Sequence, residues 1–171
     1  MFNVILIGMP GAGKTTIGRL LAKNMSAHFV DTDELIVQKT GVSIVDIFSE
    51  YGESEFRKIE RECFQDLKQM TNTVIATGGG MVTEPDLCSD LLLLGKTVGL
   101  FAKPKTLLER MTYQSKVRPM IEEVDETERL QKIFELFAER KNSYLKAEYH
   151  VNTENLKPEE VVQRIIRLIT S

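Results

Sequence analysis

The chain has 171 residues, of which 42% are hydrophobic and 27% are charged, and its formal net charge is −3. This length suits one domain with its own core, and no linker or repeat is visible, so we expect residues 1–171 to form a single domain. The charge balance gives no strong basic field, so nucleic acid is not an expected partner and any anion site must be local. No apolar run is long enough to span a bilayer and no leader pattern opens the chain, so we expect a cytoplasmic protein without a membrane partner.

The first predicted elements are a strand over residues 2–7 and a helix from about residue 14. The turn between them reads GMPGAGKT over residues 8–15, which is the G-x4-G-K-T pattern of a P-loop. Its glycines let backbone N–H groups converge on a phosphate, and the helix adds the positive end of its dipole. Lys14 should reach the β- and γ-phosphates, and the Thr15 hydroxyl should ligate Mg²⁺. The residues expected to hold a nucleoside triphosphate are Gly11, Ala12, Gly13, Lys14, Thr15 and Thr16.

Two carboxylates, Asp31 and Asp33, follow the second predicted strand, residues 28–30. Carboxyl ends of parallel strands share one edge of a sheet, so this pair should lie beside the P-loop. One carboxylate can hold Mg²⁺ directly or through water, and the other can accept a proton from an attacking hydroxyl. The alternative is that both side chains cap the helix predicted over residues 34–39, and capping is compatible with the chemical roles.

Arg57 lies on the long charged helix predicted over residues 53–70, three residues before Glu60. The two side chains can pair, and taken alone this pattern favours a solvated face held by salt bridges. An arginine beside an aromatic residue, here Phe56, also suits a small carboxylate ligand, which it can bind through two parallel hydrogen bonds. A short helix over residues 44–49 should precede this segment.

A run of three glycines, Gly78, Gly79 and Gly80, follows the third predicted strand, residues 73–76. This run is better explained by an anion site than by a plain loop, because glycines let backbone N–H groups approach an anion without interference from side chains.

The periodic pattern stops between residues 113 and 126, after a helix predicted over residues 105–112. A polar segment of this length in a small domain is often a lid, and Arg118 is a candidate for stabilising a transferring phosphate. The alternative is a surface loop with an incidental arginine. Arg140 lies late in the next predicted helix, residues 127–148, where an arginine is usually a surface charge that suits the helix dipole.

Further strands are predicted over residues 98–102 and 149–151, with helices over residues 84–94 and 159–169. Strands and helices therefore alternate, which predicts an α/β fold with a parallel sheet covered on both faces and ligands at the carboxyl ends of its strands. Asn155 follows the last strand at that edge, where a purine can lie. The inner stripe of the helix over residues 127–148 should consist of Leu130, Ile133, Phe134, Phe137 and Leu145.

Together these motifs resemble the shikimate kinases, which belong to the nucleoside-monophosphate-kinase-like group of P-loop NTPase folds. The resemblance covers essentially the whole chain. It rests on GMPGAGKTTIGR at 8–19, FVDTD at 29–33, GVSIVDIF at 41–48, GESEFRKIE at 52–60, ATGGG at 76–80 and RP at 118–119. It implies a three-layer sandwich with strand order 2-3-1-4-5, a mobile lid over residues 112–126, and a monomeric enzyme.

The resemblance implies an ATP- and Mg²⁺-dependent transfer of phosphate to the 3-hydroxyl of shikimate, a step of aromatic amino-acid biosynthesis. Asp33 would be the base and would bind the shikimate hydroxyls, while Asp31 would support Mg²⁺ through water. The shikimate carboxylate would be held by Arg57, Arg140 and the backbone of Gly79 and Gly80. The remaining implied roles are orientation of Arg57 by Glu60, contact with the carbon ring by Phe48 and Phe56, contact of Arg118 with the phosphates from the lid, and packing of Arg110 on adenine.

Two rival functions remain open at this point. A gluconate-type kinase is also a P-loop kinase of a hydroxylated acid. A catalytically silent nucleotide-binding module would keep the fold and lose turnover. The adjacent Lys141 is a second candidate for the role of Arg140.

Overall fold

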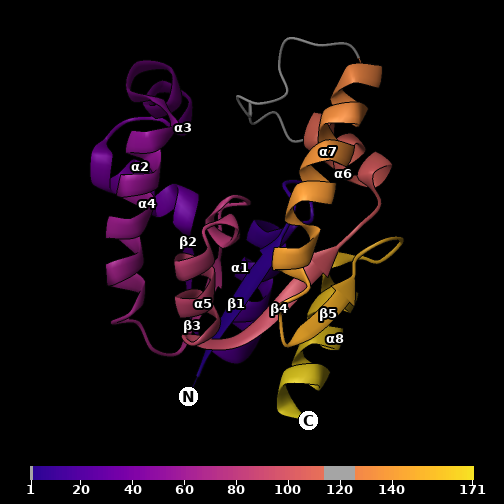
Figure 1. Ribbon diagram of the computed structural model, residues 1–171. Helices are drawn as coiled ribbons and strands as arrows, with labels where there is room; N and C mark the ends of the chain where they lie inside the picture. Colours follow the sequence, from indigo (N-terminus) through magenta and orange to yellow (C-terminus); the bar gives the residue numbers. More distant parts are fainter. Residues whose placement is uncertain (1, 114–125) are drawn as a thin grey trace.

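The computed structural model describes residues 2–113 and 126–171 of the chain (Figure 1). Its sheet has five parallel strands in the order β2-β3-β1-β4-β5, which confirms the strand order implied by the resemblance. The strands are β1 (Asn3–Gly8), β2 (His28–Asp31), β3 (Thr73–Ala76), β4 (Gly95–Phe101) and β5 (Tyr149–Asn152). No helix in these two ranges is both long and apolar enough to cross a membrane.

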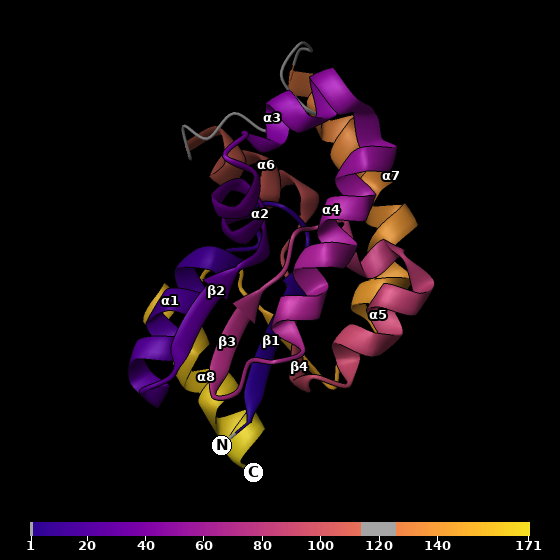
Figure 2. The same ribbon diagram turned by 90° about the vertical axis from the view of Figure 1, so that its left-hand side faces the viewer.

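Helices cover both faces of this sheet, which makes a three-layer fold (Figure 2). On one face α1 (Lys14–Met25) packs beside α8 (Pro158–Thr170). The other face is covered by α4 (Gly52–Leu67), α5 (Pro85–Leu92) and α7 (Glu126–Tyr144). The central strand β1 is buried on both sides, and it therefore reads as the unbroken apolar run Val4–Ile7.

A second, smaller cluster of buried side chains lies outside the main core. It joins α2 (Thr32–Thr40), the short α3 (Ile44–Asp46), the π-helix η1 (Ile47–Tyr51) and α4. Its buried members are Ile36, Ile47, Phe56 and Cys63. In Figure 1 these elements rise on one side of the molecule, and α6 (Pro104–Tyr113) and α7 rise on the other.

The short helix predicted over residues 44–49 is present, but only its first three residues are α-helical, and it continues as a five-residue π-helix to Tyr51. Ser43 opens α3 as expected of a cap: its Oγ accepts a hydrogen bond from the Asp46 N–H at 3.1 Å. The π-helix spans only five residues, about one turn, so it is too short for the sequence pattern to separate it from an α-helix. Gly52, with φ +78°, then ends η1 and lets α4 begin.

Two positions of the helix predicted over residues 127–148 also differ from the prediction. Phe134 and Leu145 are 49% and 46% exposed, whereas Ile133 is buried. Successive residues on a helix point about 100° apart, and on α7 this rotation takes Phe134 away from the core that Ile133 faces. Leu145 lies beyond Tyr144, where α7 ends.

Two further boundaries shift. The strand β4 begins at Gly95, three residues before the predicted start, because the less apolar segment Gly95-Lys96-Thr97 pairs with β1. The short 3₁₀-helix η2 (Met81–Thr83) precedes α5, which is shorter than the predicted helix over residues 84–94. Most of the predicted lid, residues 114–125, lies outside the described residues.

The buried side chain of Asn3 joins three segments at the amino end of the sheet. Its Nδ2 donates to the carbonyl oxygens of Met70 (2.8 Å) and Leu94 (3.2 Å), and its Oδ1 accepts from the Thr73 N–H at 3.0 Å. This one side chain therefore satisfies backbone groups that no neighbouring strand reaches.

Replacement of Asn3 by alanine should lower the free energy of unfolding by about 1–3 kcal/mol, because buried backbone groups lose their partners. Denaturant unfolding measures this loss. The control is Asn24→Ala on the exposed face of α1, where Asn24 bonds only Leu20 O of its own helix, and its effect should stay within about 0.5 kcal/mol. Equal losses in the two variants would contradict this account of Asn3.

Candidate functional site

The P-loop lies between β1 and α1 in the conformation that its glycines permit. Gly11 and Gly13 have φ values of +80° and +95°, and a Cβ on Gly11 would stand 2.7 Å from Leu107 O. Lys14 is buried, and its Nζ donates to the carbonyl oxygens of Gly8 (2.7 Å) and Met9 (3.0 Å). The ammonium group therefore lies against the loop itself, next to the N-terminus of α1.

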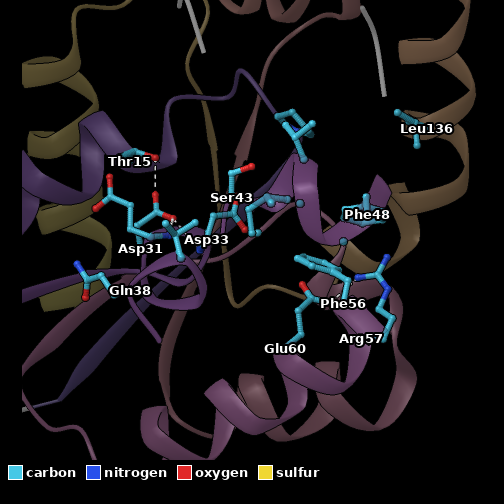
Figure 3. Close-up of a pocket in the computed structure, with 18 of the residues that line it drawn as sticks. Thr15, Asp31, Asp33, Gln38, Ser43, Phe48, Phe56, Arg57, Glu60 and Leu136 are labelled. Atoms are coloured by element: carbon cyan, nitrogen blue, oxygen red, sulfur yellow. Dashed lines mark hydrogen bonds and ion pairs between the residues drawn. The ribbon is translucent and has the colours of Figure 1, made fainter. Parts of the chain in front are cut away.

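Asp31 shares its two carboxylate oxygens between the P-loop helix and α2. Oδ2 accepts a hydrogen bond from Thr15 Oγ1 at 2.6 Å, and Oδ1 accepts from the Asp33 N–H at 3.0 Å and thereby caps α2 (Figure 3). Asp31 is thus a cap and also a neighbour of the P-loop threonine. Asp33 lies in the first turn of α2 rather than at its cap position.

A cavity of about 600 Å³ opens beside these groups (Figure 3). Its lining residues are Pro10, Thr15, Asp31, Asp33, Glu34, Val37, Gln38, Ser43, Ile44, Val45, Phe48, Phe56, Arg57, Glu60, Gly78, Gly79, Gly80, Leu136 and Arg140. A small cavity of about 30 Å³ at the P-loop is lined by Gly11, Gly13, Lys14, Thr15, Thr16, Asp31, Asp33 and Thr77. Thr15, Asp31 and Asp33 line both cavities, so this carboxylate pair lies where the two meet.

Residues 78–80, here named the glycine strap, run along the large cavity where side chains would collide. A Cβ on Gly78 would stand 2.5 Å from Asp33 Oδ1, and a Cβ on Gly80 would stand 2.8 Å from Arg57 Nη1. A Cβ on Gly79 would meet Pro10 Cδ at 3.0 Å. The three glycines therefore allow a carboxylate and a guanidinium to approach one stretch of backbone from different sides.

Arg57 reaches the cavity from α4 in a fixed orientation. Its Nη1 donates to Glu60 Oε2 at 2.5 Å, and its Nη2 donates to Glu53 Oε1 at 3.0 Å. Glu60 is only 1% exposed, and burial raises its pKa to about 7, although the positive charge of Arg57 acts in the opposite direction. The pair is therefore buried rather than part of the solvated face that the sequence pattern alone favoured, and Glu60 holds the guanidinium at the cavity wall.

Arg140 reaches the cavity from α7, on the other side of the glycine strap. It is 8% exposed, and its Nε is a buried donor that has no hydrogen-bond partner among the described residues. Lys141 is exposed and does not line the cavity. The structure therefore brings Arg140, and not Lys141, together with Arg57 and the strap, whereas the sequence alone had favoured a surface role for it.

Two aromatic rings form an apolar wall between these polar groups. The centroids of Phe48, from η1, and Phe56, from α4, lie 4.6 Å apart. Sequence reasoning missed several other lining residues, among them Val37, Gln38 and Leu136. For Leu136 a signal was available, because it precedes Arg140 by four residues and so shares its helix face.

The residues predicted for the base of the nucleotide are Arg110, which reaches from α6 to the loop after β5, and Asn155, which lies in that loop. Arg110 donates from Nη1 to Thr153 Oγ1 and from Nη2 to Thr153 O, both at 2.8 Å. Asn155 follows in the same loop with φ +55°. Arg118 lies outside the described residues.

Comparison with known proteins identifies the family of this chain. A family model described as shikimate kinase matches residues 10–170. A shikimate kinase of Thermodesulfovibrio yellowstonii is 40% identical over 167 residues, which cover 98% of this chain and 94% of the relative. The chain belongs to the shikimate kinase family.

Solved structures of shikimate kinases agree closely with this fold. The enzyme from Bacteroides thetaiotaomicron has a TM-score of 0.94 at 30% identity, with 99% of each chain covered. The enzyme from Acinetobacter baumannii, solved in complex with shikimate, has a TM-score of 0.92 at 35% identity, with 99% of this chain and 93% of that chain covered. A gluconokinase from Sinorhizobium meliloti shares the fold alone, at 14% identity and a TM-score of 0.59 over 99% of this chain and 94% of that one.

The raised pKa of Glu60 predicts a pH-dependent stability. The native state binds this proton more tightly than the unfolded chain, whose ordinary pKa is 4.5, so the stabilisation is complete below that value and is lost as the pH rises through about 7. Between about pH 5 and pH 8 the free energy of unfolding should fall by about 2 kcal/mol relative to Glu60→Gln.

Denaturant unfolding of both proteins at the two pH values measures this difference. Glu55→Gln is the matched control, because Glu55 pairs with Lys58 on the exposed face of the same helix. A pH dependence shared by the wild type and Glu60→Gln would assign it to other groups.

Proposed function

We propose that this protein transfers the γ-phosphate of ATP to the 3-hydroxyl of shikimate and forms shikimate 3-phosphate, a step of aromatic amino-acid biosynthesis. Membership of the shikimate kinase family makes it an ATP-dependent kinase of a small molecule. The observation that carries the substrate assignment is the large cavity. It joins a carboxylate beside the P-loop, Asp33, to two guanidinium groups, Arg57 and Arg140, on either side of the glycine strap.

The arginine end of the cavity suits the carboxylate of the substrate. Arg57 is already oriented by Glu60, so little side-chain freedom is lost when it binds an anion. Arg140 has a buried Nε donor that needs an acceptor. Charge-assisted hydrogen bonds from both arginines, together with N–H groups of Gly79 and Gly80, would hold a carboxylate there. The rings of Phe48 and Phe56 would face the carbon ring.

The carboxylate end suits the transfer itself. Asp33 would hydrogen-bond the substrate hydroxyls and accept the proton of the 3-hydroxyl as its oxygen bonds to the γ-phosphorus. The bond between the γ-phosphorus and the bridging oxygen then breaks, and ADP leaves. Lys14 would donate to phosphate oxygens in place of the carbonyl oxygens of Gly8 and Met9, and its positive charge would offset the negative charge of the phosphates. We assign Arg118 the same task from a lid over residues 112–126.

The residues beside the P-loop fit Mg²⁺. Thr15 Oγ1 and Asp31 Oδ2 lie 2.6 Å apart, and hydroxyl and carboxylate oxygens are the hard ligands that this ion prefers. Thr15 would hold the ion directly and Asp31 would hold it through water. When bound, the ion neutralises charge on the β- and γ-phosphates.

The loop after β5 suits the base of the nucleotide. The edge of the Arg110 guanidinium donates hydrogen bonds to Thr153, so the flat face of the group is left for stacking on adenine. Asn155 lies in the same loop as Thr153. We further propose that residues 1–171 are one P-loop kinase domain that works as a monomer in the cytoplasm.

The deciding experiment is product formation from ATP, Mg²⁺ and shikimate, read by mass spectrometry, with gluconate in a parallel reaction. A Mg²⁺-dependent shikimate monophosphate supports the assignment. Phosphogluconate alone would move the protein to the gluconate-type kinases. No product from either acid, with ATP binding intact, would favour a catalytically silent nucleotide-binding module.

Asp33→Asn should separate binding from chemistry. An amide is nearly the same size but cannot accept the proton, so kcat should fall by about 10²–10⁴-fold. Nucleotide affinity, measured by calorimetry, should stay within about twofold because Asp33 is not among the proposed phosphate ligands. Asp90→Asn, which alters an exposed pair with Lys68, is the control. An Asp33→Asn variant with unchanged turnover would remove Asp33 from the role of base.

Arg140→Ala should weaken the binding of shikimate and leave the binding of ATP largely unaffected. Loss of a charge-assisted contact should raise KM for shikimate by about 10–100-fold, while KM for ATP changes by less than about threefold. Lys141→Ala is the matched control, since that side chain is exposed on the next position of the same helix. Steady-state kinetics with each substrate varied in turn measures both effects. A larger loss in Lys141→Ala would transfer the role to that residue.

A further inference from the structure

The backbone groups at both ends of the glycine strap are fixed by hydrogen bonds. The Gly78 N–H donates to Thr32 Oγ1 at 2.7 Å, and Gly78 O accepts from the Met81 N–H at 3.2 Å. Gly80 O accepts from Thr83 Oγ1 at 2.6 Å and from the Thr83 N–H at 3.0 Å. The strap is therefore anchored before and after its central peptide.

The central peptide, between Gly79 and Gly80, has one hydrogen bond. Gly79 O accepts from Tyr144 Oη at 2.7 Å. Within the described residues, the N–H groups of Gly79 and Gly80 have no acceptor. The two glycines that carry these N–H groups line the large cavity.

A peptide between two glycines is unusually free to turn over. Neither residue has a Cβ, so both tolerate φ values of either sign, and the peptide plane can rotate by about half a turn at low cost. In a trans peptide the C=O and the following N–H point in opposite directions. Such a rotation would replace the Gly80 N–H at the cavity by the Gly79 carbonyl oxygen, which would repel an anion.

Tyr144 is well placed to prevent this rotation. Its side chain is 1% exposed and lies behind the strap, outside the cavity lining. Burial raises the pKa of its phenol to about 12, so the group stays protonated and can donate at neutral pH. It follows Arg140 by four residues on α7, so both side chains extend from one face of the helix to the strap.

We propose that Tyr144 is a positioning residue for recognition of the substrate carboxylate. Its hydroxyl holds Gly79 O away from the cavity and thereby keeps the Gly80 N–H directed into it. The acid then meets an N–H donor beside the two arginines instead of a carbonyl oxygen. This inference rests on the proposed function, because the anion in question is the carboxylate of shikimate.

The test compares two ligands in two proteins. Tyr144→Phe keeps the ring and removes the hydroxyl. Calorimetry measures the affinity of wild type and variant for shikimate and for its alcohol analogue, in which the carboxylate is replaced by a hydroxymethyl group. The variant should bind shikimate about tenfold more weakly, and the analogue within about twofold of wild type, because only the anion uses the oriented N–H. The Tyr144 hydroxyl also interacts with Arg140, so the amide resonance of Gly80, described below, separates an effect on the peptide from an effect on the arginine. In steady-state kinetics KM for shikimate should rise more than kcat falls.

The matched control is Tyr149→Phe on β5, whose hydroxyl lies 3.5 Å from Lys96 Nζ and is absent from the cavity lining. It should bind both ligands as wild type does. A second measurement follows the amide resonance of Gly80: shikimate should shift it strongly in wild type and weakly in Tyr144→Phe.

Two results would overturn the proposal. If Tyr144→Phe loses affinity for shikimate and for the alcohol by equal factors, the hydroxyl supports only the general shape of the site. If both affinities stay unchanged, the peptide needs no anchor. Either result leaves the kinase assignment intact, provided wild type still phosphorylates shikimate. Failure of wild type to bind or phosphorylate shikimate would instead overturn the proposed function, and the inference with it.

Discussion

The absence of side chains at residues 78–80 is the constraint on which the whole site depends. A Cβ at Gly78 would overlap the carboxylate of Asp33, and a Cβ at Gly80 would overlap the guanidinium of Arg57. Two groups of opposite charge can therefore face one cavity across a single stretch of backbone. The strand order explains why the strap lies there: β3 is placed between β1, which leads into the P-loop, and β2, which ends at Asp31, so the loop after β3 begins beside both. If the strands lay in chain order, β3 would instead be beside β2 and away from β1.

Burial of Glu60 carries a cost that the rest of the arrangement offsets. Removing a carboxylate from water disfavours its charged form, which is why the pKa of Glu60 rises to about 7 although Arg57 is in contact with it. In return, Arg57 has its orientation fixed before any ligand arrives. The exposed contact with Glu53 adds little, because ion pairs in water are weak. The buried half of this network therefore contributes more to geometry than to stability.

The sequence predicted those parts of the fold and site that depend on local spacing. The P-loop, the strand order, the placement of Asp31 and Asp33 and the contact of Arg57 with Glu60 all follow from patterns within a few residues or from the resemblance they carry. The π-helix Ile47–Tyr51 did not, because its apolar spacing also fits an α-helix. Tyr144 was missed for a different reason: its bond to Gly79 joins elements that are distant in the chain, and no local pattern encodes such a contact.

One carboxylate links the phosphate side of the site to the acceptor side. Oδ2 of Asp31 accepts a hydrogen bond from Thr15, on the P-loop helix, and Oδ1 accepts one from the N–H of Asp33, at the start of α2. The position of Asp33 relative to the P-loop is thus set by two hydrogen bonds of a single planar group. A phosphoryl transfer in which the protein supplies mainly position is sensitive to errors of about 1 Å. A base carried on a separate loop would depend on several flexible contacts, whereas Asp33, the base that we propose, depends on the same group that neighbours the P-loop threonine.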